Sequence, residues 1–349
     1  MTSTIRRSLL AGIAIIAIAS GGLFGIARGN ALASTPKTHP RAMTSVHFFL
    51  NWLPNVEFSG LWVAQHFGWW KAAGIDMTYT GWSPSVVPET DVPQHSGNQF
   101  GFQSGAALGI ARAQGVKDVA LYTDTQKSVF GLTVLNKSHI TNLKQLKGKK
   151  IGYQPHELYV PEAMLASVGL QPQRDYKLVP VSFDISQLTS GAVDAYEVFL
   201  TNEPITLDMQ GVKNHSFRAS DYGFHFYDDV MFTTDGLAKS NPALVRKVTA
   251  IVARGFQWAH THPVLAAQIT VAKYFPAGKG VSAQANLTQQ KFESQRFIPF
   301  SKDSHGLFSG RMTAAYWQDS LNTLLRYKLI THKPPVSSLF TNSFNPNKM

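Results

Sequence analysis

The sequence contains no cysteine. A chain without cysteine forms no disulfide framework, offers no thiolate to a metal ion, and cannot be anchored through a lipid on an N-terminal cysteine. The Gly-x-Ser-x-Gly elbow of the α/β-hydrolases is also missing. These absences exclude a disulfide-stapled scaffold and leave a serine hydrolase without support.

Among its apolar runs, the one from Leu9 to Ile26 is long enough to consider as a membrane span. It follows an arginine pair, is interrupted by glycine and serine, and leads to the small residues Ala31-Leu32-Ala33. This order is typical of a removable signal peptide rather than a membrane anchor. We therefore expect residues 1–33 to be a signal peptide cleaved after Ala33, and the mature chain to reach the periplasm.

The export route stays open between the Sec and twin-arginine pathways. Arg6-Arg7 followed by Ser8-Leu9-Leu10 resembles the twin-arginine signal, but Ile5 stands where that signal usually has a polar residue.

Acidic residues are fewer than basic ones, 21 against 32. The signal segment holds three of the basic residues and no acid, so the mature chain keeps 29 basic and 21 acidic residues, a net charge of +8. The basic residues are dispersed, and the local cluster from Lys144 to Lys150 is typical of a turn that enters a strand. Since no basic stripe or recognition motif accompanies the charge, we expect no nucleic-acid partner.

The pattern of the mature chain predicts two α/β lobes. Residues 34–43 hold two prolines and little apolar content, which indicates a flexible leader. Strands are expected near 46–51, 74–79, 98–102 and 118–122, with helices over 58–71 and 104–114 between them. This alternation predicts a mainly parallel sheet.

The pattern then repeats. Further strands are expected at 131–135, 150–153, 178–181 and 193–199, with a helix near 161–168. A strand at 229–233 leads back to the first lobe, and a long amphipathic helix follows from Pro242. We assign 44–129 and 233–349 to lobe I and 130–232 to lobe II, with a ligand cleft between them where strand ends meet.

Several runs resemble periplasmic solute-binding proteins of the thiamine-pyrimidine-precursor type, which serve ATP-driven importers. The opening runs are NWLPNVEFSGLWVA at 51–64 and GWWKAAGID at 68–76. The similarity continues through 111–115, 143–152, 190–195, 201–205, 221–223 and 340–342, so it spans nearly the whole mature chain. It implies a type II clamshell that closes on one small solute and presents it to an ABC permease.

The fold is shared with a thiamine pyrimidine synthase, which this chain also resembles. That enzyme uses a lysine-bound pyridoxal phosphate, a histidine and a cysteine-rich run. At the lysine and histidine positions this sequence has Gln103 and Ala107, which supply neither a Schiff-base amine nor an imidazole. We therefore expect no catalytic residue and no cofactor.

A metal site is not expected either. His260 and His262 stand near the end of the long helix, but a bound metal needs at least three converging ligands. We expect this histidine pair at the solvent surface.

Candidate ligand contacts stand at strand ends and in the loops that follow them. Trp52 can stack on a flat ring or belong to the core, and the resemblance places Trp82 at the cleft rim. Asn55 and Glu57 can cap backbone amides or reach the cleft, and the related opening pattern carries an acid at Glu57.

Further candidates come from later strands. Ser104 begins a helix, where it either caps the helix or binds a polar solute edge. Glu203 is the preferred polar anchor, because a carboxylate accepts two hydrogen bonds from an aminopyrimidine or ureido edge, although a hinge ion pair is the alternative. The remaining candidates are placed by topology: Gln126, Tyr153, His156, Tyr196 and Asn202.

The sequence thus predicts a monomeric, non-catalytic receptor that binds a small planar nitrogen heterocycle, such as a thiamine pyrimidine precursor, and partners an ABC permease. The alternatives are a synthase-like enzyme and a clamshell sensor of another small solute, riboflavin-like solutes included.

Overall fold

The structure is a computed structural model that describes residues 42–154, 157–181, 184–275 and 283–347. The predicted signal peptide, most of the predicted leader and His156 lie outside these ranges. Residues 42–349 form one compact unit. Within the described ranges, the helices are too short or too polar to cross a membrane.

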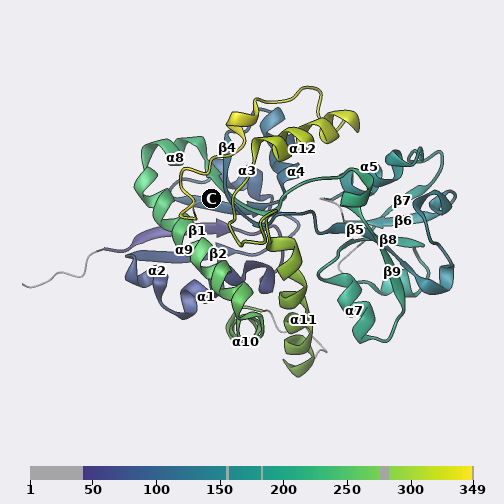
Figure 1. Ribbon diagram of the computed structural model, residues 1–349, viewed down its shortest axis with the longest axis horizontal. Coiled ribbons are helices and arrows are strands. Elements are labelled where there is room, and N and C mark those ends of the chain that lie inside the picture. The colour runs from purple at the N-terminus through teal and green to yellow at the C-terminus, as the bar shows by residue number, and fades with distance from the viewer. Residues whose placement is uncertain (1–41, 155–156, 182–183, 276–282, 348–349) are drawn as a thin grey trace, which may run out of the picture. The chain divides into compact units, whose positions relative to one another are not determined.

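Two five-stranded sheets organise the chain (Figure 1). The first has the order β2-β1-β3-β10-β4, with β1 at Thr44–Phe49, β2 at Ile75–Thr80, β3 at Gln99–Gln103, β4 at Asp118–Thr125 and β10 at Asp228–Thr234. The second has the order β7-β6-β8-β5-β9, with β5 at Phe130–Leu135, β6 at Lys150–Tyr153, β7 at Lys177–Pro180, β8 at Ala195–Phe199 and β9 at Asn214–Arg218.

Each sheet contains one strand that runs against the other four. In the first sheet β10 is antiparallel to both of its neighbours, and in the second sheet β5 is. The other neighbouring pairs, β1 with β2 and β3 and β6 with β7 and β8, are parallel. The predicted α/β class is confirmed. Four strands of each sheet run in one direction, but half of the neighbouring pairs are antiparallel, so the sheets are mixed rather than mainly parallel.

The reversed strands mark where the chain crosses between sheets. The predicted boundary between residues 129 and 130 falls after β4 and before β5, while the predicted return at residue 233 falls inside β10. We call the first sheet with its helices the first lobe, and the second sheet with its helices the second lobe.

Helices cover the sheets and connect their strands (Figure 1). In the first lobe these are α1 (Ser59–His66), α2 (Trp69–Ala72), α3 (Pro88–Gln94), α4 (Gly105–Ala113), α8 (Asp235–Ser240), α9 (Pro242–Thr261), α10 (Pro263–Lys273), α11 (Ala283–Ser301) and α12 (Ala314–Arg326). In the second lobe they are α5 (Tyr159–Ser167), α6 (Ser186–Thr189) and α7 (Glu203–Met209).

The core of the first lobe depends on a close crossing of α1 and α9. A Cβ atom added to Gly255 would lie 2.0 Å from the carbonyl oxygen of Gly60, and one added to Gly60 would lie 2.4 Å from the ring of Phe256. The glycines therefore let the two helix backbones touch. This contact fixes the position of α1, whose N-terminal end follows the candidate site residues.

Candidate ligand-binding site

Trp52 lies just beyond the carboxyl end of β1 and contacts aromatic rings from both lobes. Its ring is 6.2 Å from that of Phe199 at an interplanar angle of 14°, and 6.4 Å from that of Trp82. The Trp82 backbone N–H donates to the Trp52 carbonyl oxygen at 3.0 Å, which fixes the turn. Since Phe199 ends β8, this stack places Trp52 at the boundary between the lobes.

A cavity of about 240 Å³ opens beside Trp52. The first lobe contributes Trp52, Leu53, Asn55, Phe275, Gln289, Gln290 and Glu293, and the second lobe contributes Ile185, Asn202, Glu203 and Thr206. Four of the residues predicted from the sequence, Trp52, Asn55, Asn202 and Glu203, therefore line one cavity. No lysine or arginine is among the described residues that line it.

Glu203 supplies a buried carboxylate from the second lobe. It occupies the first turn of α7, directly after the chain leaves β8, and its Oε2 accepts the Phe199 N–H at 2.8 Å. Burial raises the pKa of Glu203 to about 7, although hydrogen bonds from its own N–H and from that of Phe199 oppose the rise. The carboxyl group therefore holds its proton more readily than an exposed glutamate does.

Helix α11 supplies the facing wall. Gln289 Nε2 donates to Asn202 Oδ1 at 3.3 Å, to Thr206 Oγ1 at 3.1 Å and to Glu293 Oε1 at 2.8 Å. Gln289 thus connects α11 of the first lobe with α7 of the second, and the two helices are neighbours in Figure 1.

Glu293 is the second carboxyl group of the cavity. Gln290 Nε2 donates to its Oε2 at 2.6 Å, while Gln290 Oε1 accepts the Val56 N–H at 2.9 Å. Burial raises the pKa of Glu293 to about 8, and the hydrogen bonds from Gln289 and Gln290 oppose the rise. The sequence analysis named no candidate contact in α11. The signal that could have found one was Glu293 itself, which is the first acid after Asp235 and stands in a glutamine-rich segment.

Glu57 and Asp229 form a buried acid pair close to these carboxyl groups. Asn55 Oδ1 accepts the Glu57 N–H at 2.9 Å, so the predicted capping role is the one that the Asn55 side chain adopts. Burial raises the pKa of both carboxyl groups, and the charge of Asp229 raises the pKa of Glu57 further. The charges of Glu203 and Glu293 raise the pKa of Glu57 further, which places all four carboxyl groups in one electrostatic cluster.

This cluster favours a solute that donates hydrogen bonds or carries positive charge. Two of the four carboxyl groups, Glu203 and Glu293, line the cavity, and no lysine or arginine stands among its described lining residues. Their raised pKa values mean that an amino group or a cation could replace the protons that they hold. The ring of Trp52 adds a flat apolar wall.

Ser104 makes a separate contact between the lobes. Its Oγ accepts the Ala107 N–H at 3.2 Å, as expected for a helix cap, and is 2.9 Å from the hydroxyl oxygen of Tyr159 in α5. The neighbouring Gln103 donates from Nε2 to Glu89 Oε2 at 2.7 Å. Sequence reasoning missed Tyr159, because nothing local marks a buried tyrosine as an interlobe contact.

Besides Glu57, Trp82 and Ser104, three further predicted residues lie outside the lining of this cavity. Gln126 Nε2 donates to the carbonyl oxygen of Arg311 at 3.1 Å, so its side chain ties the crossover to the C-terminal segment. Tyr153 is half-buried at the end of β6. Tyr196 is buried with Val198 in the second-lobe core, because alternate residues of β8 face opposite sides and Phe199 faces the other one.

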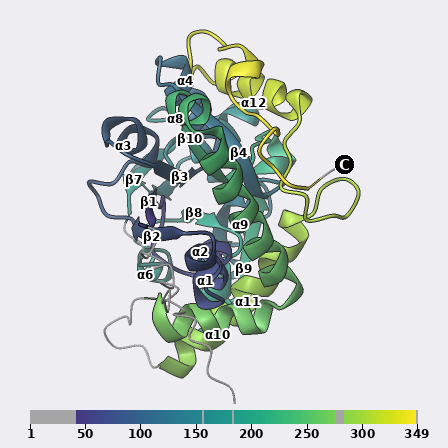
Figure 2. The same cartoon turned by 90° about the vertical axis from the view of Figure 1, so that its left-hand side faces the viewer.

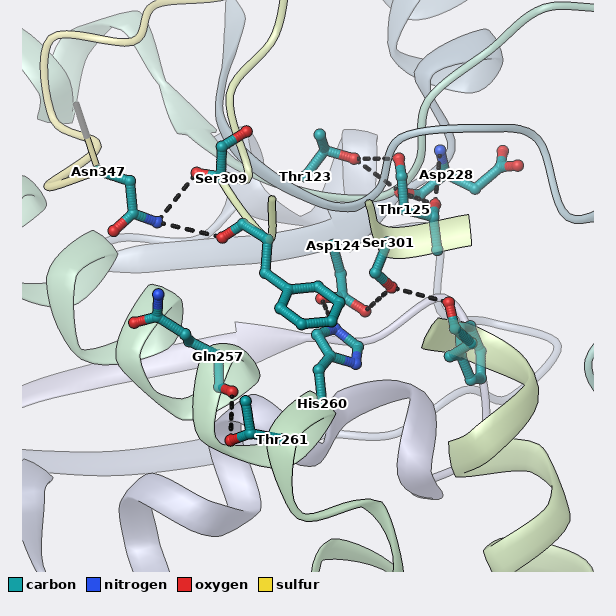
Figure 3. A network of polar contacts seen from close by, with 12 residues as sticks. Thr123, Asp124, Thr125, Asp228, Gln257, His260, Thr261, Ser301, Ser309 and Asn347 are labelled. Carbon is teal, nitrogen blue, oxygen red and sulfur yellow. Dashed lines mark hydrogen bonds and ion pairs between the residues drawn. The ribbon is translucent and has the colours of Figure 1, made fainter. Parts of the chain in front are cut away.

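Buried polar contacts surround the crossover from β4 to β5 (Figure 3). The Asp228 carboxylate accepts the Val129 N–H at 2.8 Å, and Thr123 Oγ1 donates to the Asp228 carbonyl oxygen at 2.9 Å. Beside them, His260 Nε2 is 2.7 Å from Asp124 Oδ1 (Figure 3). The predicted surface position of His260 is wrong, because its side chain pairs with Asp124 and is buried under the ring of Phe308.

A family profile described as NMT1/THI5 like matches residues 55–266. The riboflavin-binding protein RibY of Chloroflexus aurantiacus is 24% identical over 324 residues, which cover 90% of this chain and 89% of RibY. A putative thiamine biosynthesis protein of Haemophilus influenzae is 25% identical over 216 residues, which cover 60% of this chain and 67% of that protein.

Solved structures share the fold. The periplasmic aliphatic sulphonate binding protein SsuA from Escherichia coli superposes with a TM-score of 0.61 at 14% identity, over 86% of this chain and 92% of SsuA. The desulfurization enzyme DSZB gives a TM-score of 0.56 at 18% identity, over 87% of this chain and 98% of DSZB. The fold is therefore that of periplasmic binding proteins, as the sequence predicts, and an enzyme uses it as well.

Proposed function

Because the chain belongs to the NMT1/THI5-like family, we propose that it is the exported solute-binding component of an ABC-type importer. The observation that carries the proposal is the cavity in which Trp52 of the first lobe faces Asn202 and Glu203 of the second. A solute bound there contacts both lobes, so binding is coupled to their closure. The closed form is what a membrane permease would recognise.

The proposed solute is a small planar nitrogen heterocycle, with a thiamine pyrimidine precursor as the first candidate. An indole stacks on such a ring, and a carboxylate accepts two hydrogen bonds from an aminopyrimidine edge. The relative from Haemophilus influenzae, with its thiamine biosynthesis name, supports this candidate.

A riboflavin-like solute is the second candidate, supported by the name and the long alignment of RibY. The cavity volume favours the smaller solute. About 240 Å³ lies below the roughly 300–1,000 Å³ of pockets that hold drug-sized ligands, so a single ring fits more readily than a three-ring flavin.

The enzyme alternative has less support. Gln103 stands where the synthase pattern has its lysine, and its amide nitrogen donates a hydrogen bond to Glu89. We propose a non-catalytic, monomeric receptor in the periplasm, freed from its signal peptide after Ala33. A clamshell sensor would use the same cavity and differ only in its membrane partner.

Native mass spectrometry of the protein purified from its own periplasm tests the proposal, followed by calorimetry with pyrimidine and flavin candidates. We expect a bound heterocycle and an affinity that falls about tenfold in Trp52→Ala, because stacking is lost. Trp258→Ala, whose indole lies outside the cavity lining, serves as the matched control.

Turnover of the bound solute would overturn the receptor assignment. Tight binding of flavin without binding of pyrimidine would overturn the solute assignment alone. Equal affinity of wild type and Trp52→Ala would show that the cavity is not the site.

A further inference from the structure

We propose that the first lobe carries a second interaction surface, on α1, α2 and α9, that binds the anionic face of a phospholipid bilayer. We call it the aromatic-basic patch, and it consists of Phe67, Trp69, Lys247, Arg254, Trp258 and His262. The elements that carry it lie together on the face turned toward the viewer in Figure 2.

Four rings contact one another in a row on this face, of which Phe67 and His262 are exposed and Trp69 and Trp258 are half-buried. The ring of Phe67 is 5.4 Å from that of Trp69 and 5.0 Å from that of Trp258, which stacks on His262 at 4.5 Å. Phe67 keeps 45% of its surface exposed, and Leu265 at the start of the adjacent α10 keeps 48%. Large apolar side chains that are exposed on neighbouring helices indicate an interaction site.

Basic side chains accompany the rings. The guanidinium carbon of Arg254 lies 3.7 Å from the centre of the Trp69 ring, and Lys247 Nζ donates to the Ala73 carbonyl oxygen at 3.1 Å. Lys247, Arg254 and Trp258 stand at helical spacing, so they occupy one stripe of α9. The stripe therefore presents positive charge beside the aromatic row.

Acids are absent from the segments that build this face. The sequence has no aspartate or glutamate from Phe58 to Ile75 or from Gly236 to Phe292, and Asp76 is the first acid after α2. Within the described residues, no salt bridge engages Lys247 or Arg254. The residues of the patch therefore carry a net positive charge without an ion-pair partner among the described residues, which complements an anionic partner.

The combination of tryptophan and basic residues selects a bilayer among anionic partners. Tryptophan favours the membrane interface, where its ring is apolar and its N–H meets headgroup oxygens. Neither Trp69 nor Trp258 donates an indole hydrogen bond to another described residue, so both N–H groups remain available. A basic, aromatic helical surface is the composition that binds in the interface plane.

Such binding would give a receptor without cysteine a reversible attachment to the membrane. It needs neither a lipid anchor nor the cavity, which lies between the lobes. The patch is therefore independent of the identity of the solute.

Vesicle sedimentation and tryptophan fluorescence test the patch. The chain should begin at Ser34, because the apolar run at 9–26 would bind vesicles by itself, and residues 42–349 form one compact unit. We expect binding to phosphatidylglycerol vesicles with a blue-shifted emission, little binding to phosphatidylcholine vesicles, and weakening as salt is raised.

Two double variants separate the contributions. Phe67→Ala with Trp258→Ala should weaken binding about tenfold or more through lost apolar burial. Lys247→Gln with Arg254→Gln should weaken binding to phosphatidylglycerol about fivefold for each charge removed. Leu307→Ala and Lys144→Gln, which change exposed residues elsewhere, should bind as the wild type does. Thermal unfolding checks that each variant is folded.

Four results would overturn the proposal. They are equal binding to both lipids, no binding to either, unchanged binding by both folded double variants, and patch-dependent dimers in sedimentation without lipid. A short DNA duplex that binds more tightly than the vesicles and displaces them would also overturn it, because the patch would then be a site for polyanions.

Discussion

The carboxylate of Glu203 offers the sharpest probe of the cavity. Glu203→Gln preserves the side-chain volume and keeps one oxygen that can accept the Phe199 N–H. In the wild type, Oε2 accepts this N–H at 2.8 Å. It removes the negative charge that a solute donor would meet, and it replaces the other oxygen, which accepts from Asn202 Nδ2 at 3.4 Å, by an amide donor. We therefore expect a folded variant with a normal second lobe and a weaker solute complex.

The size of the effect follows from the hydrogen bonds that the carboxylate can accept. A bond to a charged group contributes about 1.5–3 kcal/mol, against about 0.5–1.5 kcal/mol for a neutral one. The loss is then about 1–1.5 kcal/mol for each bond, so affinity falls about tenfold for one bond and about a hundredfold for two.

The pH dependence gives a second readout. Burial raises the pKa of Glu203 to about 7, and a solute donor needs the ionised form. For a solute that does not itself titrate, affinity should be highest above pH 7 and fall as the pH drops below that value. Glu203→Gln should lose this component, whereas contributions from Glu293 and the Glu57–Asp229 pair remain.

Isothermal titration calorimetry at several pH values measures both effects. Asn202→Ala is a useful companion, because it removes a lining amide and leaves the charge of Glu203 in place. An unchanged affinity in Glu203→Gln, or a pH profile identical to that of the wild type, would refute the role of Glu203 in solute recognition.

Two further predictions concern stability. Burial raises the pKa of Glu293 from 4.5 to about 8, so the folded chain holds this proton more tightly than the unfolded chain. The resulting stabilisation is complete below pH 4.5 and is lost as the pH rises toward 8. The unfolding temperature of the solute-free protein should therefore fall between these two pH values. In Glu293→Gln the unfolding temperature should fall less over the same range. An equal slope in both proteins would contradict this. Gly255→Ala should lower the free energy of unfolding by about 1–3 kcal/mol in urea, because its Cβ would meet the Gly60 carbonyl. The matched change Gly236→Ala in α8, whose Cβ would meet Thr234 Oγ1 at an ordinary contact distance of 3.6 Å, should be neutral or stabilising. Similar losses in both variants would exclude the helix contact as the cause.

The fold was predictable because its elements carry regular patterns. Strand β1 ends at Phe49, a few residues before Pro54, and helices such as α4 and α12 begin at capping residues. The rule that strand ends meet at a cleft then brought Trp52, Asn202 and Glu203 to one cavity, although 149 or more residues separate Trp52 from the other two in the sequence.

The rest of the site follows no local pattern. Gln289 and Glu293 stand on a helix whose polar face is typical of solvent exposure, and the packing of α11 against α7, α10 and the segment Val56–Phe58 leaves Gln289 half-buried and Glu293 buried. His260 has the same explanation, since its partner Asp124 is 136 residues away. The position of Tyr196 could have been predicted from the sequence. Side chains alternate between the two faces of a strand, so Tyr196 and Phe199, three residues apart in β8, lie on opposite sides of the sheet.

The pairing of β4 with β10 makes the second lobe an insertion that could be excised. Thr125 and Asp228, where the chain leaves and re-enters the first sheet, are direct partners in the antiparallel ladder. A two-residue hairpin turn would span that gap. A chain shortened in this way would keep the complete five-stranded first sheet and its aromatic-basic patch, and it would lose Asn202 and Glu203. The architecture therefore allows membrane attachment and solute capture to be separated in a single deletion.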